Sequence, residues 1–303
     1  MPWGKTVAMR NDRGNDETAR ALQSVLDAMI DPINQLFLHS RMLRAWGHSL
    51  GATRNMEWVE KMRRPGDLAV ALHRHGASPQ SREARDLEIG HDPASILAAD
   101  AAQTRWFLGT VEAALARCPG ADDRALLERI AAAEREDLAR LEAWGAGPQA
   151  REARRGAKFL LPKPGVAEIA VAAINAVLPA MTASVSQFFH HSLMFRGDGD
   201  GELAERELAM ALVMMYRSEA MLERLLDLGG IPEGRGHGRV RIGQGASGAD
   251  TTAVAALDAL LAALQSAREP VNGIVDPTTH TLLDGITRAL RDDRAAIAAR
   301  LAA

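Results

Sequence analysis

The sequence contains one cysteine and few aromatic residues, and each scarcity excludes a class of protein. The lone Cys118 excludes a disulfide framework within the chain and any zinc or iron–sulfur site built from cysteines. Aromatic residues are 4% of the 303 residues, while alanine and leucine dominate, so we expect an all-helical protein. A single free thiol also fits a reducing compartment, and the expected location is the cytoplasm.

Excess positive charge and a long lipid-compatible segment are also missing. The formal net charge of -3 gives no electrostatic basis for nucleic-acid binding. The chain opens with a polar stretch that predicts a loose leader and not a targeting segment. Residues 169–189 carry no formal charge but include several polar side chains near their middle, which are costly in lipid. We therefore expect a buried helix there, and no membrane span.

The chain divides into two parts that resemble each other. INQLFLHSRML (33–43) and VSQFFHHSLMF (185–195) share Gln, Phe, His, Ser and Met in register, and LEIG (87–90) matches VRIG (240–243). A segment rich in Gly, Pro, Arg and Lys separates the two parts. The sequence thus predicts an internal duplication, with domains at 17–147 and 166–303 and a linker at 148–165.

Apolar residues recur at spacings of three and four, which predicts four helices in each part. The connection between the second and third helices is long in both parts. This order is that of a four-helix bundle with one long crossover, and we expect two such bundles in tandem, packed as a pseudo-dimer. The expected helices cover residues 17–50, 55–75, 93–118, 122–144, 166–195, 201–228, 250–267 and 277–301.

INQLFLHSRMLRAWG closely resembles the first-helix signature of bacterioferritins, and VSQFFHHSLMF resembles it less closely. The x-Ile-Gly turn in LEIG and VRIG is similar to that family in both halves. The resemblance implies a ferritin-like fold for each bundle. Bacterioferritins close their shell with a short fifth helix, and the sequence ends at Ala303 just after the eighth predicted helix. We therefore expect no storage cage from this chain alone, although a homo-oligomer stays possible.

The resemblance implies a di-iron ferroxidase centre in each bundle, with one Glu on the first and third helices and Glu-x-x-His on the second and fourth. Such a centre needs several carboxylate ligands. Most matching residues here cannot bind iron, so we expect no di-iron centre and no ferroxidase activity. The matching positions are Met29, Lys61, Arg64, Thr104, Glu134 and Asp137 in the first half, and Met181, Met214, Arg217, approximately Leu260, Asp293 and Ala296 in the second.

The stretch KMRR (61–64) lies in the middle of a predicted helix. Lys61 and Arg64 would face Glu134 and Asp137 of the fourth helix, so that two cations replace the metal ions beside two carboxylates. Buried charges need partners, which makes this exchange physically coherent. The alternative is that all four side chains lie on solvated faces.

The resemblance also implies a b-type haem held between two subunits by one methionine from each. The matching residues are Met62 and Met215. Met62 follows Lys61 in the sequence, so it should point out of its bundle, and two halves packed together could place both thioethers on one haem. Methionine is also a common gap-filler in protein cores, which is the competing interpretation. His39 and His191 align, and we expect both to be packing residues and not ligands.

The leading hypothesis is a bacterioferritin-like haem protein without ferroxidase activity that transfers electrons within a larger redox complex. Its partner would be a redox protein or another bacterioferritin-like subunit. A second hypothesis is a degenerate subunit that stores iron beside an active partner. A third is a structural module without cofactor, in which the two methionines pack on each other.

Overall fold

The computed structural model describes residues 12–80, 85–152, 165–272 and 276–302, and it contains no strand within these ranges. The all-helical class is therefore confirmed. One 3-10 helix, η1 (Pro148–Arg151), opens the predicted linker, of which residues 153–164 lie outside the described ranges. The α-helices are α1 (Asp12–Ala45), α2 (Gly51–Lys61), α3 (Arg64–Arg74), α4 (Pro93–Leu115), α5 (Ala121–Ala146), α6 (Val166–Asp198), α7 (Gly201–Asp227), α8 (Gly245–Asn272) and α9 (Pro277–Leu301).

Several helix ends differ from the predicted ones. α1 begins at Asp12, inside the predicted leader, and ends at Ala45 instead of residue 50. Gly47 ends it, because this glycine has a left-handed backbone (φ 64°) and the amides of Gly47 and His48 bond back to the last turn. α8 is also longer than predicted at both ends, and its Pro270 is accommodated within the helix.

The second predicted helix of the first half is broken in two, which corrects the placement of KMRR inside one helix. α2 ends at Lys61, and α3 begins at Arg64 with Pro65 in its first turn. A proline has no amide hydrogen and crowds the carbonyl four residues earlier, so a continuous helix through this point is disfavoured. Lys61 and Arg64 consequently lie at the facing ends of two short helices.

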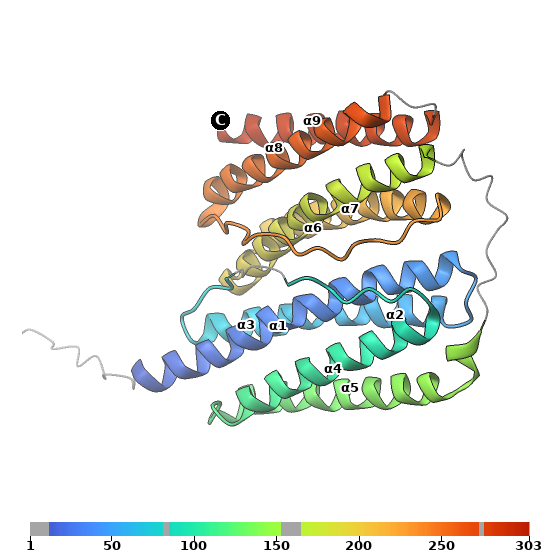
Figure 1. Cartoon of the computed structure of the whole chain (residues 1–303). Coiled ribbons are helices and arrows are strands. Elements are labelled where there is room, and N and C mark those ends of the chain that lie inside the picture. The colour runs from blue at the N-terminus through green and yellow to red at the C-terminus, as the bar shows by residue number, and fades with distance from the viewer. Residues whose placement is uncertain (1–11, 81–84, 153–164, 273–275, 303) are drawn as a thin grey trace, which may run out of the picture.

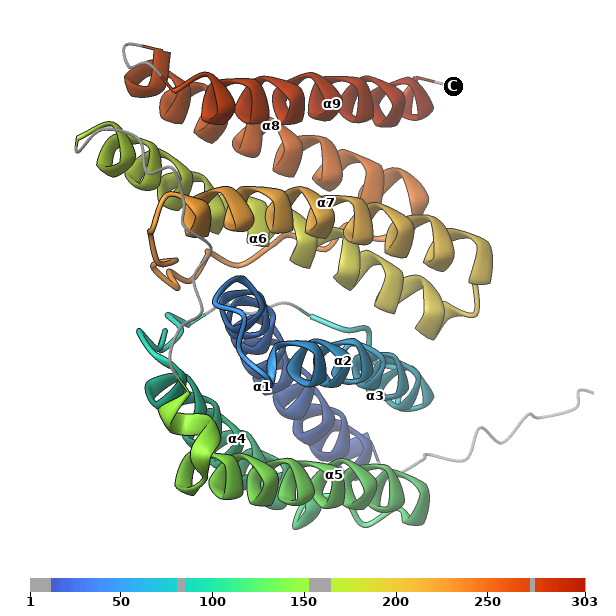
Figure 2. The same cartoon turned by 90° about the vertical axis from the view of Figure 1, so that its right-hand side faces the viewer.

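The helices form two layers of bundles (Figures 1 and 2). In the first half α1 packs against α2, α3 and α4, and α4 packs against α5. In the second half α6 packs against α7 and α8, and α8 packs against α9. The halves meet where α3 lies against α6 and α1 lies against α7. The tandem bundles thus pack on each other as a pseudo-dimer, as the sequence predicts.

The described parts of the two crossover segments (77–80 and 85–92 in the first half, 229–244 in the second) run across the same side of the molecule (Figures 1 and 2). They touch through the backbone: the amide of Leu87 donates to the carbonyl of Gly234 at 2.7 Å, and the amide of Gly236 donates to Asp86 Oδ1 at 2.7 Å. Gly234 has φ +55°, and a Cβ there would lie 2.7 Å from the Leu87 carbonyl oxygen. Glycine therefore permits this close contact between the halves.

A buried histidine ties each crossover to the first helix of its half. The Gly90 amide donates to His39 Nε2 at 3.2 Å, and the Gly243 amide donates to His191 Nε2 at 3.5 Å. The opposite ring nitrogen faces a carboxylate in both halves, on Asp100 for His39 and on Glu207 for His191. The two sequence matches noticed in each half are therefore in contact in space, and both histidines have packing roles.

α6 and α8 are long and apolar enough to cross a membrane by length and composition. The same test is passed by the buried helix of a soluble bundle, so it is weak evidence for a span. α6 contains the uncharged segment 169–189, and it packs against α3, α7 and α8.

Candidate functional site

The interior of the first bundle contains the predicted ion pairs. Lys61 Nζ lies 2.8 Å from Glu134 Oε2 and 2.7 Å from Asp137 Oδ2, and Arg64 pairs with the other oxygen of Glu134. The side chains of Glu134 and Asp137 are each 2% exposed and that of Lys61 is 7% exposed, so these charges are not on a solvated face. The sequence-based expectation of an inward ion-pair network is confirmed.

The network continues to residues that the sequence analysis did not single out. Arg54 is 2% exposed, and its guanidinium lies 2.7 Å from Asp100 Oδ2 and 3.4 Å from Asp137 Oδ1. Asp100 in turn accepts from His39 Nδ1 at 2.6 Å. Asp100 could have indicated this extension of the network from the sequence, because an aspartate in the apolar run of α4 needs a buried partner. A chain of hydrogen bonds and ion pairs therefore crosses the bundle from His39 to Arg64.

These contacts hold the carboxylates in the ionised form. Burial alone would raise the pKa of Asp100, but the charges of His39 and Arg54 and their hydrogen bonds bring it well below its usual range. The pKa of Asp137 is likewise lowered, because Lys61 and Arg54 outweigh burial. The pKa of Arg54 is raised, since three carboxylates outweigh its own desolvation. The interior therefore contains anions that are already neutralised by side-chain cations.

The remaining di-iron positions of the first half are also inside the bundle. Met29 is 2% exposed and Thr104 is 3% exposed. A thioether and a hydroxyl are poor ligands for iron beside neutralised carboxylates. Five of the six positions are thus buried and the sixth, Arg64, is 23% exposed, and their donor set does not suit two iron ions.

The second bundle buries three of its six matching residues, Met181, Met214 and Leu260. Met181 and Met214 are fully buried, and Arg217 lies 2.6 Å from Asp293. Ala296 is exposed, so its assignment to the bundle interior is wrong: Ile297 is the buried residue of that turn. The pairing of Thr104 with Leu260 is also corrected. The buried positions of α4 recur in α8 when Thr104 is matched with Leu257.

Met62 and Met215 lie on the walls of one cavity between the two halves. The cavity is small, with a volume of about 40 Å³. Met62 follows the end of α2, and Met215 lies in α7 and is 7% exposed. The other lining residues are largely apolar, from α1, α2, α6 and α7: Ile33, Asn34, Phe37, Trp58, Thr182, Val185 and Ser218.

One wall of this methionine cavity is a stack of two aromatic rings under a guanidinium. The ring centroids of Phe37 and Trp58 are 5.4 Å apart, and the Arg41 guanidinium lies 4.6 Å from the first and 4.5 Å from the second. Arg41 Nε also donates to Glu219 of the other half at 3.1 Å. Burial lowers the pKa of Arg41, although Glu219 opposes this. Arg41 therefore fixes the aromatic wall and joins the halves.

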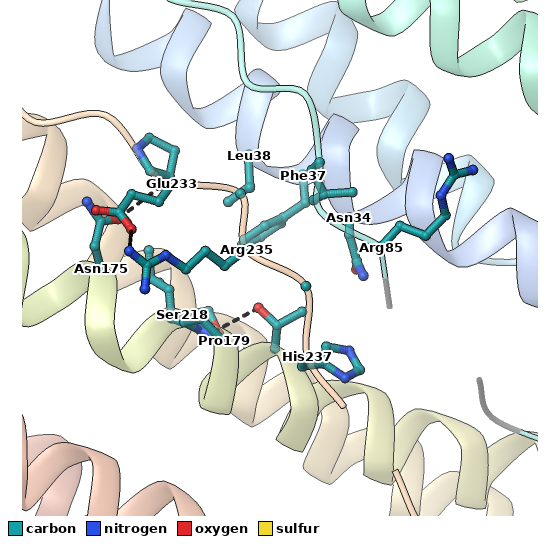
Figure 3. A pocket seen from close by; sticks show the side chains of 16 residues that line it. Asn34, Phe37, Leu38, Arg85, Asn175, Pro179, Ser218, Glu233, Arg235 and His237 are labelled. Atoms are coloured by element: carbon teal, nitrogen blue, oxygen red, sulfur yellow. Dashed lines mark hydrogen bonds and ion pairs between the residues drawn. The ribbon is translucent and has the colours of Figure 1, made fainter. Parts of the chain in front are cut away.

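A second cavity of about 50 Å³ adjoins the first and shares Asn34, Phe37, Thr182 and Ser218 with it. Figure 3 shows this crossover cavity, with side chains of α1 on one side and of α6 and the second crossover on the other. Arg235 pairs with Glu233 at 2.6 Å on its rim. The two cavities lie side by side between the halves, and both are lined mostly by apolar surface.

Within the ranges that the structure describes, no group of three or more His, Cys, Asp and Glu side chains is arranged to hold a metal ion. Met62 and Met215 are the two sulfur-bearing side chains on the walls of the methionine cavity.

The fold, with two helical bundles that each have a long crossover, is of the ferritin-like class. The chain matches no protein-family model. It is 28% identical over 134 residues to bacterioferritin from Mycobacterium bovis and to bacterioferritin BfrA from Mycobacterium tuberculosis, a match that covers 43% of this chain and 84% of each relative. This distant similarity supports a ferritin-like protein with an iron-related role.

Proposed function

We propose that the chain is a bacterioferritin-like b-type haem protein that transfers electrons and lacks ferroxidase activity. The observation that carries the proposal is that Met62 and Met215, from opposite halves, line the same cavity. Chance packing of twelve methionines would not select the two residues that match the haem ligands of bacterioferritins. The similarity to bacterioferritin over 134 residues supports the same assignment.

The lining of the cavity has the chemistry of a haem site, but its volume of about 40 Å³ is far smaller than a macrocycle, so binding requires the halves to move apart. Phe37, Trp58 and Val185 supply apolar surface for a flat macrocycle, and the thioether sulfurs of Met62 and Met215 are soft donors for its iron. The group would extend into the crossover cavity, which shares four lining residues with the methionine cavity. When bound, haem supplies one-electron chemistry, and thioether ligation raises its reduction potential. The chain itself orients the group, excludes water and fixes the aromatic wall through Arg41.

The absence of ferroxidase activity is proposed from the donor set of the bundles. Lys61 and Arg64 stand where a glutamate and a histidine would bind iron, and they neutralise the carboxylates that remain. Iron could enter only if these ion pairs separated, which would leave buried charges without partners at a cost of several kcal/mol. In the second bundle Met214 and Arg217 stand at the corresponding positions.

We also propose that the halves arose by duplication, with domains at 17–147 and 166–303. The recurrent bonds from His39 to Gly90 and from His191 to Gly243 support this, because they join the same motifs in each half. The match to bacterioferritin uses 43% of this chain but covers 84% of the relative, so one half of the chain corresponds to one relative. The proposed location is the cytoplasm, and the proposed partner is a redox protein.

Expression with ample haem followed by absorption spectroscopy tests the proposal. We expect a Soret band in the purified protein, and its loss or strong decrease in Met62→Ala and Met215→Ala. Met56→Ala is the matched control. Met56 lies in α2, the helix that ends just before Met62, but Met56 is 60% exposed. The control should keep the band. Circular dichroism of each variant shows whether the helices are intact.

A colourless protein after haem supply would overturn the proposal, as would equal effects of Met56→Ala and Met62→Ala. A colourless protein whose thermal stability does not change on adding haem would favour the structural module. A large shell with retained ferric iron, formed with an active bacterioferritin partner, would favour iron storage.

A further inference from the structure

The second half carries a surface groove that shares no lining residue with the methionine cavity. It lies between α6, α8 and the second crossover and has a volume of about 400 Å³. Its floor is formed largely by small side chains, among them Ala183, Ala256 and Ala259. Arg239 and Arg241 border it, both are exposed, and neither forms an ion pair with a carboxylate in the described part of the chain.

The groove exists because two side chains of the first half have no counterpart in the second. Counted from the matched Gly90 and Gly243, Arg85 corresponds to Gly238 and Trp106 corresponds to Ala259. In the first half the Arg85 guanidinium lies on the Trp106 ring, 4.7 Å from its centroid. Arg85 accordingly points away from the crossover cavity in Figure 3. Gly238 and Ala259 both line the groove, so the volume of this stack is empty in the second half.

The charges beside the Arg85–Trp106 pair of the first half are opposite in sign to those beside the groove of the second half. The segment Asp86-Leu-Glu88 of the first half corresponds to Arg239-Val-Arg241 of the second. Glu88 is exposed and forms no ion pair within the described residues, and Trp106 is 36% exposed. The first half thus presents an exposed aromatic ring beside two carboxylates. The second half presents an apolar groove beside two guanidinium groups.

We propose that the groove binds the first-half face of a second copy of this chain. Trp106 and Arg85 of one copy would fill the groove of the next, with Glu88 paired to Arg241 and Asp86 near Arg239. Each copy carries both surfaces, so one copy offers its face to the groove of the next and its groove to another face. The same contact closes a two-fold dimer when it is made reciprocally, and it builds rings or chains when it is made head to tail. Charge complementarity and the missing stack both select this occupant.

Sedimentation velocity over a range of concentrations tests the proposal on the full chain. We expect the average mass of the wild type to rise with concentration. Arg241→Glu and Glu88→Arg should each weaken association about tenfold or more, because each places like charges together. An equimolar mixture of the two variants should restore association, since a reversed groove then meets a reversed face.

Ala259→Trp is a further variant that fills the groove from within and should abolish association. Tryptophan stands at this position in the first half, so the helix can carry it. Circular dichroism and haem content should stay at wild-type values in all variants, which separates this result from the fate of the haem proposal. A wild type that stays monomeric at every concentration overturns the proposal, even if the groove binds a fatty acid. Association that survives Ala259→Trp or is not restored in the mixture also overturns it.

Discussion

Replacing Lys61 by methionine is the most direct test of the ion-pair network in the first bundle. Lys61 contacts two carboxylates, Glu134 and Asp137, at 2.8 and 2.7 Å, and all three side chains are almost fully buried. Removing one partner of a buried pair typically costs about 3–5 kcal/mol. Arg64 still pairs with Glu134 and Arg54 lies 3.4 Å from Asp137 in the variant. We therefore expect the lower end, about 3 kcal/mol of unfolding free energy at pH 7.

The pH dependence of this loss has a definite sign. In the wild type the pKa of Asp137 is lowered, so its contribution to stability is present above its unfolded pKa and is lost as the pH falls through the folded value. Without Lys61 the pKa of Asp137 rises relative to the wild type. The difference in stability carried by Asp137 is therefore largest near neutral pH and shrinks as the carboxylate becomes protonated in both proteins.

Urea unfolding followed by circular dichroism at pH 7 and at pH 4 measures both effects. Arg105→Met is the matched control: Arg105 lies 2.7 Å from Glu142, but both side chains are about half exposed. Exposed pairs contribute about 1 kcal/mol or less, so this control should stay close to the wild type. A Lys61→Met protein that loses no more than Arg105→Met would refute the reasoning, as would a loss that grows at low pH.

Three smaller changes test other parts of the fold. Gly234→Ala should lower the unfolding free energy by about 1–3 kcal/mol, because the added Cβ would meet Ile89 and the Leu87 carbonyl. Gly238→Ala is the control and should have little effect, since a Cβ there meets no atom within 4 Å. Urea titration compares the two variants. Burial lowers the pKa of His190 to about 4, so its neutral form stabilises the fold above the unfolded pKa near 6.5 and that stability is lost as the pH falls. His190→Leu should remove about 2 kcal/mol of the acid sensitivity between pH 7 and pH 4.5, and unchanged sensitivity would contradict this cause. Asp92→Ala should cost about 0.5–2 kcal/mol, since Asp92 accepts from the Ser95 amide in a capping box at the start of α4; a thermal melt unchanged from the wild type would contradict it.

The architecture could be predicted from the sequence because its signals are local and repeated. Apolar periodicity marks the helices, and the motifs around His39 and His191 recur in both halves. The break between α2 and α3 was missed although Pro65 was visible, because the apolar pattern continues through it. The helix start at Asp12 was also missed. Polar residues there have no apolar period, and tertiary contacts further along α1 stabilise the helix.

The site could be predicted only in part, for a physical reason. Lys61, Glu134 and Asp137 follow from the resemblance, but Arg54 joins them from the same helix as Lys61, two turns earlier, at a position that the motif does not include. Partners of buried charges are set by three-dimensional proximity. Ala296 illustrates a different kind of error. Its helix was predicted correctly, but a small error in the alignment register assigned this exposed residue to the buried face.

The tie between Arg41 and Glu219 makes the contact between the halves one-sided. In a true two-fold dimer each such pair would occur twice, because every contact is repeated by symmetry. Here the positions equivalent to Arg41 and Glu219 are Leu193 and Gly66, which carry no charge. A group held between the halves therefore meets two chemically different faces, and a docking protein would find a single orientation where a symmetric dimer offers two. A single substitution at this contact also acts once per molecule, so each face can change independently of the other.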